Sequence, residues 1–86
     1  MKVYIPDTLR SYTGDQRTVT AQGATLAALL IDLDRQFPGI RFRMIDEQGH
    51  LRPHIKLFID QALTRDIRAP IPTGATVMIV AALSGG

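Results

Sequence analysis

The sequence contains no cysteine. This excludes disulfides, thiolate metal sites, iron–sulfur clusters and a cysteine that acts as a nucleophile or carries a persulfide. The chain also lacks any stretch that approaches the ~20 apolar residues of a membrane span, and its first residues lack the longer apolar run of a signal peptide. We therefore expect a cytoplasmic protein without a membrane partner.

A strong charge of either sign is missing as well. Ten Lys and Arg residues against eight Asp and Glu give a net charge of +2, which is too small to indicate nucleic-acid binding. No P-loop for a nucleotide is present. The chain has 86 residues, of which 45% are hydrophobic and 21% are charged. This composition predicts one globular domain with little room for a deep active site.

Two short strands are predicted near the N-terminus. Residues 2–5 alternate between polar and apolar side chains and stop at Pro6, which has no amide hydrogen to donate. The turn residues at 12–15 are followed by β-branched residues in 17–21, which suit a second strand. We expect the two strands to pair as a hairpin.

A change in the spacing of apolar residues predicts the main helix. Apolar residues recur at helical spacing at Leu26, Leu29, Leu30, Leu33 and Phe37. Thr25 is a suitable N-cap, and Pro38 with the glycine after it ends the helix. The pattern therefore predicts a helix over residues 25–37.

The second half of the chain returns to strands. Residues 40–54 hold an apolar set and a turn-rich polar loop, which indicate a short irregular or helical turn. Residues 55–60 alternate again, and 62–68 suit a short edge strand. Residues 76–83 are apolar on both faces, as in a central strand with parallel pairing.

An apolar strand at each end of the chain and one helix between them favour an α+β arrangement. The last strand lies beside the first and parallel to it, and the helix packs across one face of the sheet. This is the β-grasp fold, with a mixed sheet of four or five strands. We expect the domain to occupy residues 1–82 and a flexible tail to occupy residues 83–86.

The carboxyl terminus is the candidate reactive site. The chain ends in Leu83, Ser84, Gly85 and Gly86. Two terminal glycines have no β-carbons and fit a channel that is too narrow for side chains. Fully extended, these residues reach ~13–14 Å beyond the sheet. The reactive group is then the α-carboxylate of Gly86, although two glycines at a chain end can also carry no function.

These features together resemble the ThiS/MoaD-type sulfur carriers, which are prokaryotic relatives of ubiquitin. The resemblance spans essentially the whole chain, and it is carried by residues 25–30, 37–39, 46–54, 55–60, 74–80 and 84–86. The segment 46–54 looks most like the subgroup linked to thiolation of cysteine or other small metabolites. This chain has Gly74-Ala75-Thr76 where many members have an acidic turn.

The resemblance implies a carrier that is not itself an enzyme. A ubiquitin-activating-type adenylyltransferase attaches AMP to the Gly86 carboxylate, sulfur from a donor replaces AMP, and the thiocarboxylate gives its sulfur to a biosynthetic enzyme's substrate. That substrate belongs to the synthesis of a cofactor, cysteine or another small metabolite. ATP and its magnesium belong to the activating partner, so no cofactor is expected on this chain.

Two other functions stay open at this stage. One is a ubiquitin-like modifier that becomes linked to lysines of target proteins through Gly86. The other is a non-catalytic β-grasp binding module whose tail is inert. The sequence does not decide between carrier and modifier, because both begin with the same adenylation.

A docking face for partners is predicted from strand parity. Side chains alternate along a strand, and one set in these strands is predicted to face the helix: Val3, Ile5, Ile55, Leu57, Ile59, Val77 and Ile79. The residues on the opposite side are Tyr4, Phe58, Met78 and Val80. Apolar residues exposed together on a sheet are typical of interaction sites. The alternative is ordinary packing of these side chains beneath a loop.

A few charged and titratable residues have a weaker claim to function. His50 and His54 lie four apart, but Gly49 and Pro53 argue against a helix there, and we expect no metal site. Five arginines in the second half of the chain suit a solvated surface or, as second choice, docking to an acidic partner. They are Arg41, Arg43, Arg52, Arg65 and Arg68.

Overall fold

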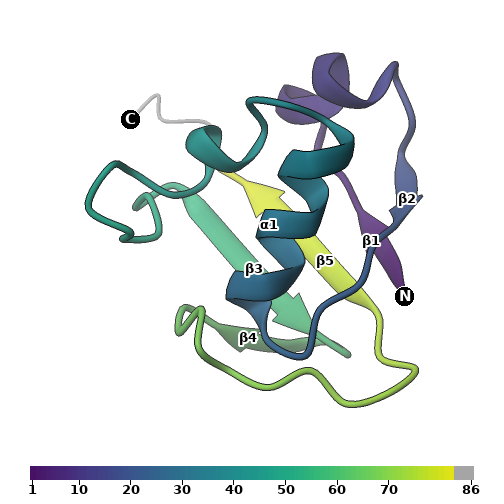
Figure 1. The fold of residues 1–86 in the computed structure, drawn as a ribbon, viewed down its shortest axis with the longest axis vertical. Coiled ribbons are helices and arrows are strands. Elements are labelled where there is room, and N and C mark those ends of the chain that lie inside the picture. The colour runs from purple at the N-terminus through teal and green to yellow at the C-terminus, as the bar shows by residue number, and fades with distance from the viewer. Residues whose placement is uncertain (83–86) are drawn as a thin grey trace.

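The computed structural model describes residues 1–82, and its strands form one five-stranded sheet in the order β2-β1-β5-β3-β4. Helix α1 lies across one face of this sheet (Figure 1). Within these residues no helix has both the length and the apolar character needed to cross a membrane. The elements are β1 (Lys2–Tyr4), the 3₁₀ helix η1 (Asp7–Thr13), β2 (Thr18–Thr20), α1 (Leu26–Gln36), the 3₁₀ helix η2 (Arg41–Arg43), β3 (Ile55–Ile59), β4 (Ala62–Thr64) and β5 (Val77–Ala81).

The middle of the sheet is formed by the two ends of the chain. β5 pairs in parallel with β1, with Val3 opposite Val77, and it pairs antiparallel with β3 on its other side. β2 and β4 are the edges of the sheet, each joined to its neighbour as a hairpin. This topology confirms the β-grasp arrangement predicted from the apolar strands at the chain ends.

The helix is close to its predicted bounds because its capping residue was correctly identified. The Thr25 hydroxyl oxygen accepts a hydrogen bond from the Ala28 N–H at 3.2 Å, which satisfies one of the helix's unpaired donors. At the other end the Phe37 N–H donates to the Leu33 carbonyl at 2.7 Å. The helix's four buried leucines all face the sheet, and they are Leu26, Leu29, Leu30 and Leu33.

The strands are shorter than predicted, and the edge strand differs most. Predicted over 62–68, it ends at Thr64. The following segment leaves the sheet because its backbone bonds to the start of α1: the Ile67 carbonyl accepts from the Ala27 N–H at 2.7 Å and the Ala69 carbonyl from the Leu26 N–H at 3.1 Å.

Helix η1 was not predicted from the sequence. It buries Leu9 and Thr13, and the Thr13 hydroxyl lies 2.9 Å from the Gln16 carbonyl oxygen and 3.2 Å from that of Arg10. A 3₁₀ helix has three residues per turn and rarely runs long, so it leaves no 3.6-residue apolar period to recognise.

Replacing Leu29 with alanine tests this packing. Leu29 is fully buried against the sheet, so Leu29→Ala should lower the free energy of unfolding by about 2–5 kcal/mol. Ile31→Ala is the matched control on the same helix, because Ile31 is 58% exposed and its loss should change stability by less than ~0.5 kcal/mol. Urea unfolding measures both, and equal effects would contradict the assigned core face of α1.

Candidate functional site

The predicted reactive group lies outside the described part of the chain. Gly86, Gly85 and Ser84 fall in the segment 83–86, whereas the description ends at residue 82. The structure places the point from which this segment starts. β5 ends at Ala81, and the Ala82 N–H donates a hydrogen bond to the His54 carbonyl oxygen at 2.8 Å. The base of the tail is therefore fixed beside the start of β3.

A row of side chains crosses all five strands on the sheet face opposite α1, and we call it the outer-face row. Met78 is the centre of the row, with Tyr4 opposite it on β1 and Phe58 opposite it on β3. Tyr4 is 36% exposed and Met78 43% exposed, whereas Phe58 is half-buried. In order across the sheet the row is Thr18, Tyr4, Met78, Phe58 and Leu63.

The four docking residues predicted from parity do share this face. Val80 lies two residues along β5 from Met78, toward the tail, and pairs with Lys56. It is half-buried, so Met78 and Tyr4 offer the more accessible apolar surface. The structure therefore brings the predicted residues together and makes Met78 the most central of them.

Leu63 belongs to the outer-face row and was missed in the sequence. It is 55% exposed and lies opposite Phe58. A two-residue turn, in which Asp60 and Gln61 both have positive φ, sets this register. Such turns favour glycine or asparagine, so an Asp-Gln pair gave little signal for a tight hairpin.

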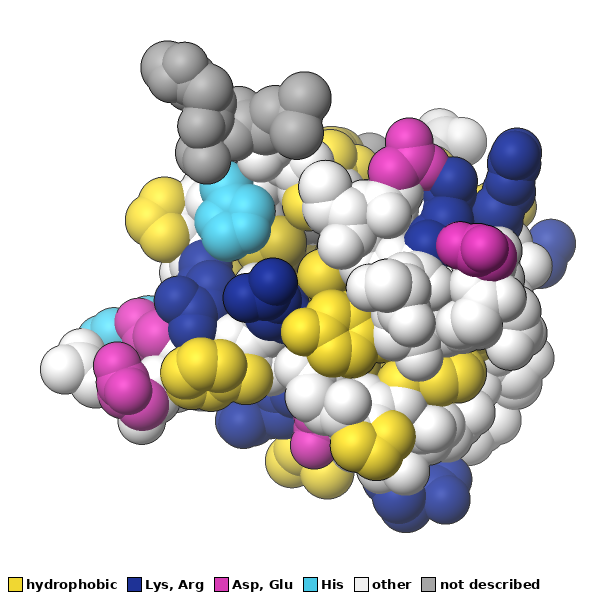
Figure 2. All heavy atoms as spheres, turned by 90° about the horizontal axis from the view of Figure 1, so that it is seen from above, with side chains coloured by type: hydrophobic (Ala, Val, Ile, Leu, Met, Phe, Trp, Pro, Cys, Tyr) yellow, Lys and Arg dark blue, Asp and Glu magenta, His cyan; other side chains and the backbone are white. Residues whose placement is uncertain are grey.

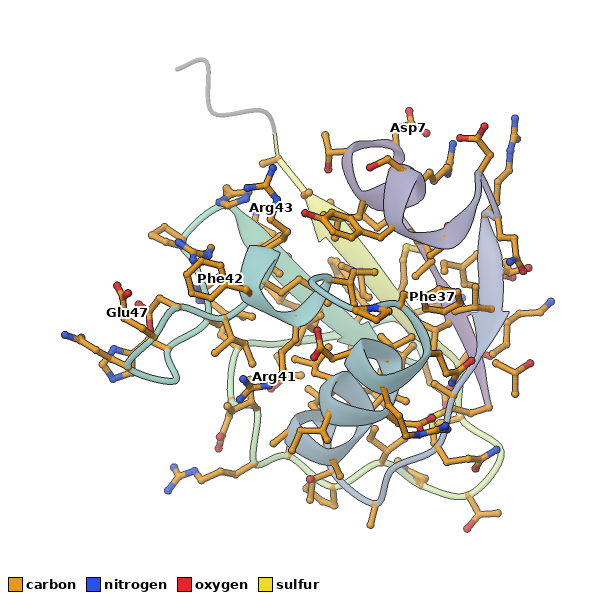
Figure 3. All side chains as sticks on the ribbon, turned by 45° about the horizontal axis from the view of Figure 1, so that its top comes forward. Asp7, Phe37, Arg41, Phe42, Arg43 and Glu47 are labelled. Atoms are coloured by element: carbon orange, nitrogen blue, oxygen red, sulfur yellow. The ribbon has the colours of Figure 1, made fainter. Side chains whose placement is uncertain are left out.

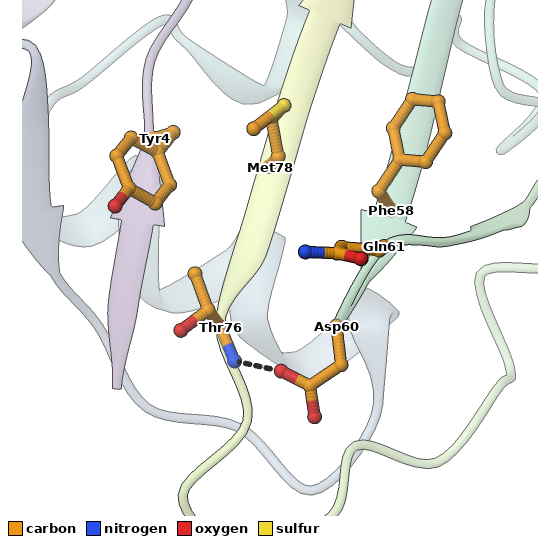
Figure 4. A pocket seen from close by; sticks show the side chains of 6 residues that line it. All are labelled: Tyr4, Phe58, Asp60, Gln61, Thr76 and Met78. Carbon is orange, nitrogen blue, oxygen red and sulfur yellow. Dashed lines mark hydrogen bonds between the residues drawn. The ribbon is translucent and has the colours of Figure 1, made fainter.

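A hollow lies beside the middle of the outer-face row, on the side away from the tail. Tyr4, Phe58 and Met78 line it together with Asp60, Gln61 and Thr76 (Figure 4). The Thr76 N–H donates to Asp60 Oδ1 at 2.9 Å, and the Asp60 N–H donates to the Thr76 carbonyl at 2.9 Å. Asp60 therefore holds a carboxylate against the N–H of Thr76, the last residue of the Gly74-Ala75-Thr76 turn, which has no acidic residue of its own.

The loop after η2 is organised by one carboxylate. Asp46 Oδ1 accepts hydrogen bonds at 2.9 Å from the backbone N–H groups of both Gln48 and His50. The N–H of His50 is the main cause that lowers the pKa of Asp46. Asp46 is thus a turn-forming residue.

The five arginines singled out in the sequence do not form one face. Arg41 and Arg43 project in opposite directions from η2 (Figure 3). Arg65 and Arg68 line a hollow beside Gly49 and Leu51, whereas Arg43 and Arg52 line a separate one. These arginines therefore lie on separate surfaces, and a 3₁₀ turn with three residues per turn points the side chains of Arg41 and Arg43 in different directions.

The comparisons with known proteins agree with the fold and with the sequence pattern. The family model described as "ThiS family" matches residues 3–86. Sulfur carrier protein CysO of Mycobacterium tuberculosis is 34% identical over 89 residues, which cover 98% of this chain and 96% of the relative. The protein of the same name from Mycobacterium bovis matches with the same identity and coverage.

Solved structures give the same picture. A chain of the Amycolatopsis orientalis BexX/CysO complex superposes with a TM-score of 0.90 at 31% identity, covering 99% of this chain and 98% of that one. Mycobacterium tuberculosis CysO superposes with a TM-score of 0.89 at 32% identity, covering 95% and 98%. SAMP1 from Haloferax volcanii shares the fold, with a TM-score of 0.84 at 22% identity, covering 100% of this chain and 98% of that one. The match over residues 3–86 and the CysO relatives confirm the resemblance seen in the sequence, and this chain belongs to the ThiS family.

Proposed function

We propose that this protein is a sulfur carrier that transports sulfur as a thiocarboxylate on Gly86. The observation that carries the proposal is membership of the ThiS family over residues 3–86, in a chain that ends Gly85-Gly86. The curated relatives at 34% identity are named sulfur carrier proteins. The absence of cysteine from the sequence is consistent with carriage on the terminus, because no thiol is present to carry sulfur instead.

The chemistry takes place in partner enzymes. In the first step the Gly86 carboxylate oxygen attacks the α-phosphorus of ATP, which forms an acyl adenylate and releases pyrophosphate. In the second, sulfide (HS⁻) supplied by a donor attacks the acyl carbon; a C–S bond forms, the C–O bond to AMP breaks, AMP leaves and the thioacid loses its proton. The resulting thiocarboxylate then donates sulfur during synthesis of cysteine or another small metabolite.

The outer-face row is the proposed docking surface for the activating adenylyltransferase. Apart from Thr18 at the β2 edge it is apolar, and it includes Tyr4, Phe58 and Met78, with Val80 beside it. A contiguous exposed apolar surface of this kind is expected at a protein interface. A structural relative of this chain from Amycolatopsis orientalis is found in a BexX/CysO complex, which supports a protein partner for this chain.

Intact-mass spectrometry tests the proposal directly. The protein is incubated with its activating enzyme, ATP and a sulfide donor, and one terminal oxygen should be replaced by sulfur. Omission of ATP is the control and should leave the mass unchanged. Adducts to lysines without any thiocarboxylate would favour the modifier instead; the SAMP1 structures, at 20–22% identity, share the fold and do not by themselves support that role.

A further inference from the structure

A second surface lies beside the base of the tail, and we call it the arginine hollow. It contains none of the residues of the outer-face row. In Figure 2, which looks onto this end of the molecule, basic side chains and a histidine gather around apolar ones. The residues that line the hollow are Thr8, Leu9, Phe42, Arg43, Arg52 and His54.

The side chain of Arg52 is held in place by Phe42. Arg52 Nε donates to the Phe42 carbonyl oxygen at 2.9 Å, and the guanidinium carbon lies 4.8 Å from the centre of the Phe42 ring. This uses one of the five N–H donors of the guanidinium and fixes its plane. Within residues 1–82 the Arg52 Nη atoms make no hydrogen bond, so a planar fork of donors is left for an acceptor from outside.

The positive charges of the arginine hollow have no carboxylate within ion-pair distance in the described chain, and Asp46 is an acidic residue whose charge interacts with Arg52 from farther away. Within residues 1–82, Arg10, Arg35 and Arg68 each have a carboxylate within ion-pair distance. Arg43 and Arg52 have none, and no carboxylate lines the hollow. Within the same residues Arg17, Arg41 and Arg65 also have no carboxylate at ion-pair distance. Arg43 and Arg52 differ from them because they line one hollow together, beside the base of the tail.

Phe42 adds an apolar element to this charged surface. The sequence places it in the same apolar set as Ile40, Met44 and Ile45, which are all fully buried, yet Phe42 is 54% exposed. Its ring points outward from η2 near Arg43 (Figure 3). An exposed aromatic ring beside two arginines is typical of protein interfaces, where aromatic residues and arginine are both enriched.

The position of the arginine hollow beside the tail indicates which partner surface contacts it. The Ala82 N–H is bonded to the carbonyl of His54, which lines the hollow. Four residues separate Ala82 from the carboxylate of Gly86, and four residues span at most ~14 Å. Any enzyme that takes Gly86 into its active site must therefore place its own surface close to the arginine hollow.

We propose that the arginine hollow binds an acidic surface segment of the activating enzyme, with a carboxylate of that enzyme on the guanidinium of Arg52 and an apolar side chain against Phe42. This rests on the proposed function, since it requires uptake of Gly86 by an enzyme. The hollow steers the carrier and sets the orientation in which the tail enters, while the outer-face row supplies apolar contact.

Charge reversal in the hollow tests this proposal through the KM for the carrier in pyrophosphate release by the activating enzyme. Arg43→Glu and Arg52→Glu should each raise that KM about tenfold with little change in kcat, because rim charges act mainly on association. Raising the salt concentration should raise the KM of the wild-type protein, because salt screens the attraction to an acidic segment, and should lower the KM of Arg43→Glu and Arg52→Glu relative to wild type, because salt screens the repulsion. Arg43→Glu removes no hydrogen bond of the described structure, so its fold is preserved.

Arg68→Glu is the matched control. It makes the same change of charge, but Arg68 lies next to the segment bonded to the N-terminal turn of α1, at the opposite end of the helix from η2. If the wild-type protein is activated but Arg43→Glu and Arg52→Glu have the same KM as Arg68→Glu, the hollow does not bind an acidic segment of the enzyme. That result would leave the proposed sulfur-carrier function intact. A wild-type protein that is not activated would overturn the proposed function itself.

A nucleotide phosphate is the competing occupant of the hollow. Titration of the carrier alone with ATP, followed by NMR, separates the two. The proposal expects no shifts for Arg43, Arg52 and His54 at the ATP concentration of the activation assay. Saturable shifts confined to these residues would replace the acidic protein segment with a nucleotide.

Discussion

Deletion of Gly86 should abolish formation of the thiocarboxylate. The shortened chain still ends in a carboxylate, on Gly85, but that group is withdrawn by up to ~3.6 Å. Misplacement of a reacting group by even about 1 Å can cost on the order of 100-fold in rate, so activation should fall below detection. Intact-mass spectrometry after incubation with the activating enzyme, ATP and sulfide provides the measurement.

The same deletion should leave the fold unchanged. The buried core residues of the described chain run from Val3 to Ile79, so none of them is removed. The thermal midpoint followed by circular dichroism should therefore equal that of the full-length protein. A Gly86→Ala variant is the companion test, because it keeps the length and the carboxylate but adds a β-carbon in a channel expected to be narrow. Sulfur loading of the deletion variant at the wild-type rate would exclude Gly86 as the carrier group.

The sequence was informative where one physical signal dominated. The apolar residues of β5 on both faces predicted a central strand, and β5 does pair with β1 on one side and with β3 on the other. Only the face toward α1 is buried, because Met78 on the other face is 43% exposed. The helix was predicted within one residue at each end because Thr25 and Pro38 are strong local signals. Together these two elements determine the topology.

Features that depend on tertiary contacts were not visible in the sequence. Gly23 is an example: a β-carbon there would lie 2.4 Å from the backbone nitrogen of Leu29, so the loop before α1 can approach the helix only without a side chain. No pattern in the sequence around Gly23 predicts this contact. The exposure of Phe42 likewise depends on the direction that η2 takes after the helix, and not on a local pattern.

The candidate site likewise combines features that the sequence predicts with features that depend on tertiary contacts. Parity alone placed Tyr4, Phe58, Met78 and Val80 on one face, because side chains alternate strictly along a strand. The alternation of side chains along a strand does not predict how deeply each one is buried. In the structure Val80 is half-buried and lies opposite Lys56. Val80→Asp would place a carboxylate opposite that lysine, and an ion pair between them would reduce the effect of the substitution on docking. Met78 is therefore the better position at which to test the face.

Met78→Asp should reduce activation by the adenylyltransferase about 30- to 1000-fold in kcat/KM, which corresponds to about 2–4 kcal/mol of lost binding at an interface centre. Met78 lies between Tyr4 and Phe58, so a carboxylate there would be stripped of water by any apolar partner surface without a matching charge. Stability should fall by no more than about 1 kcal/mol, the span of strand propensities, since a side chain that is 43% exposed leaves no cavity.

Ile31→Asp is the matched control for Met78→Asp, because it also places a carboxylate at an exposed apolar position, 58% exposed in this case, but on α1 across the sheet from the outer-face row. Its activation should match the wild-type protein. Equal losses in both variants would point to general charge repulsion from the partner. A loss confined to Met78→Asp, with a near-normal melting curve, requires contact at the outer face, because the two changes add the same charge to the same small domain and differ only in the surface that carries it.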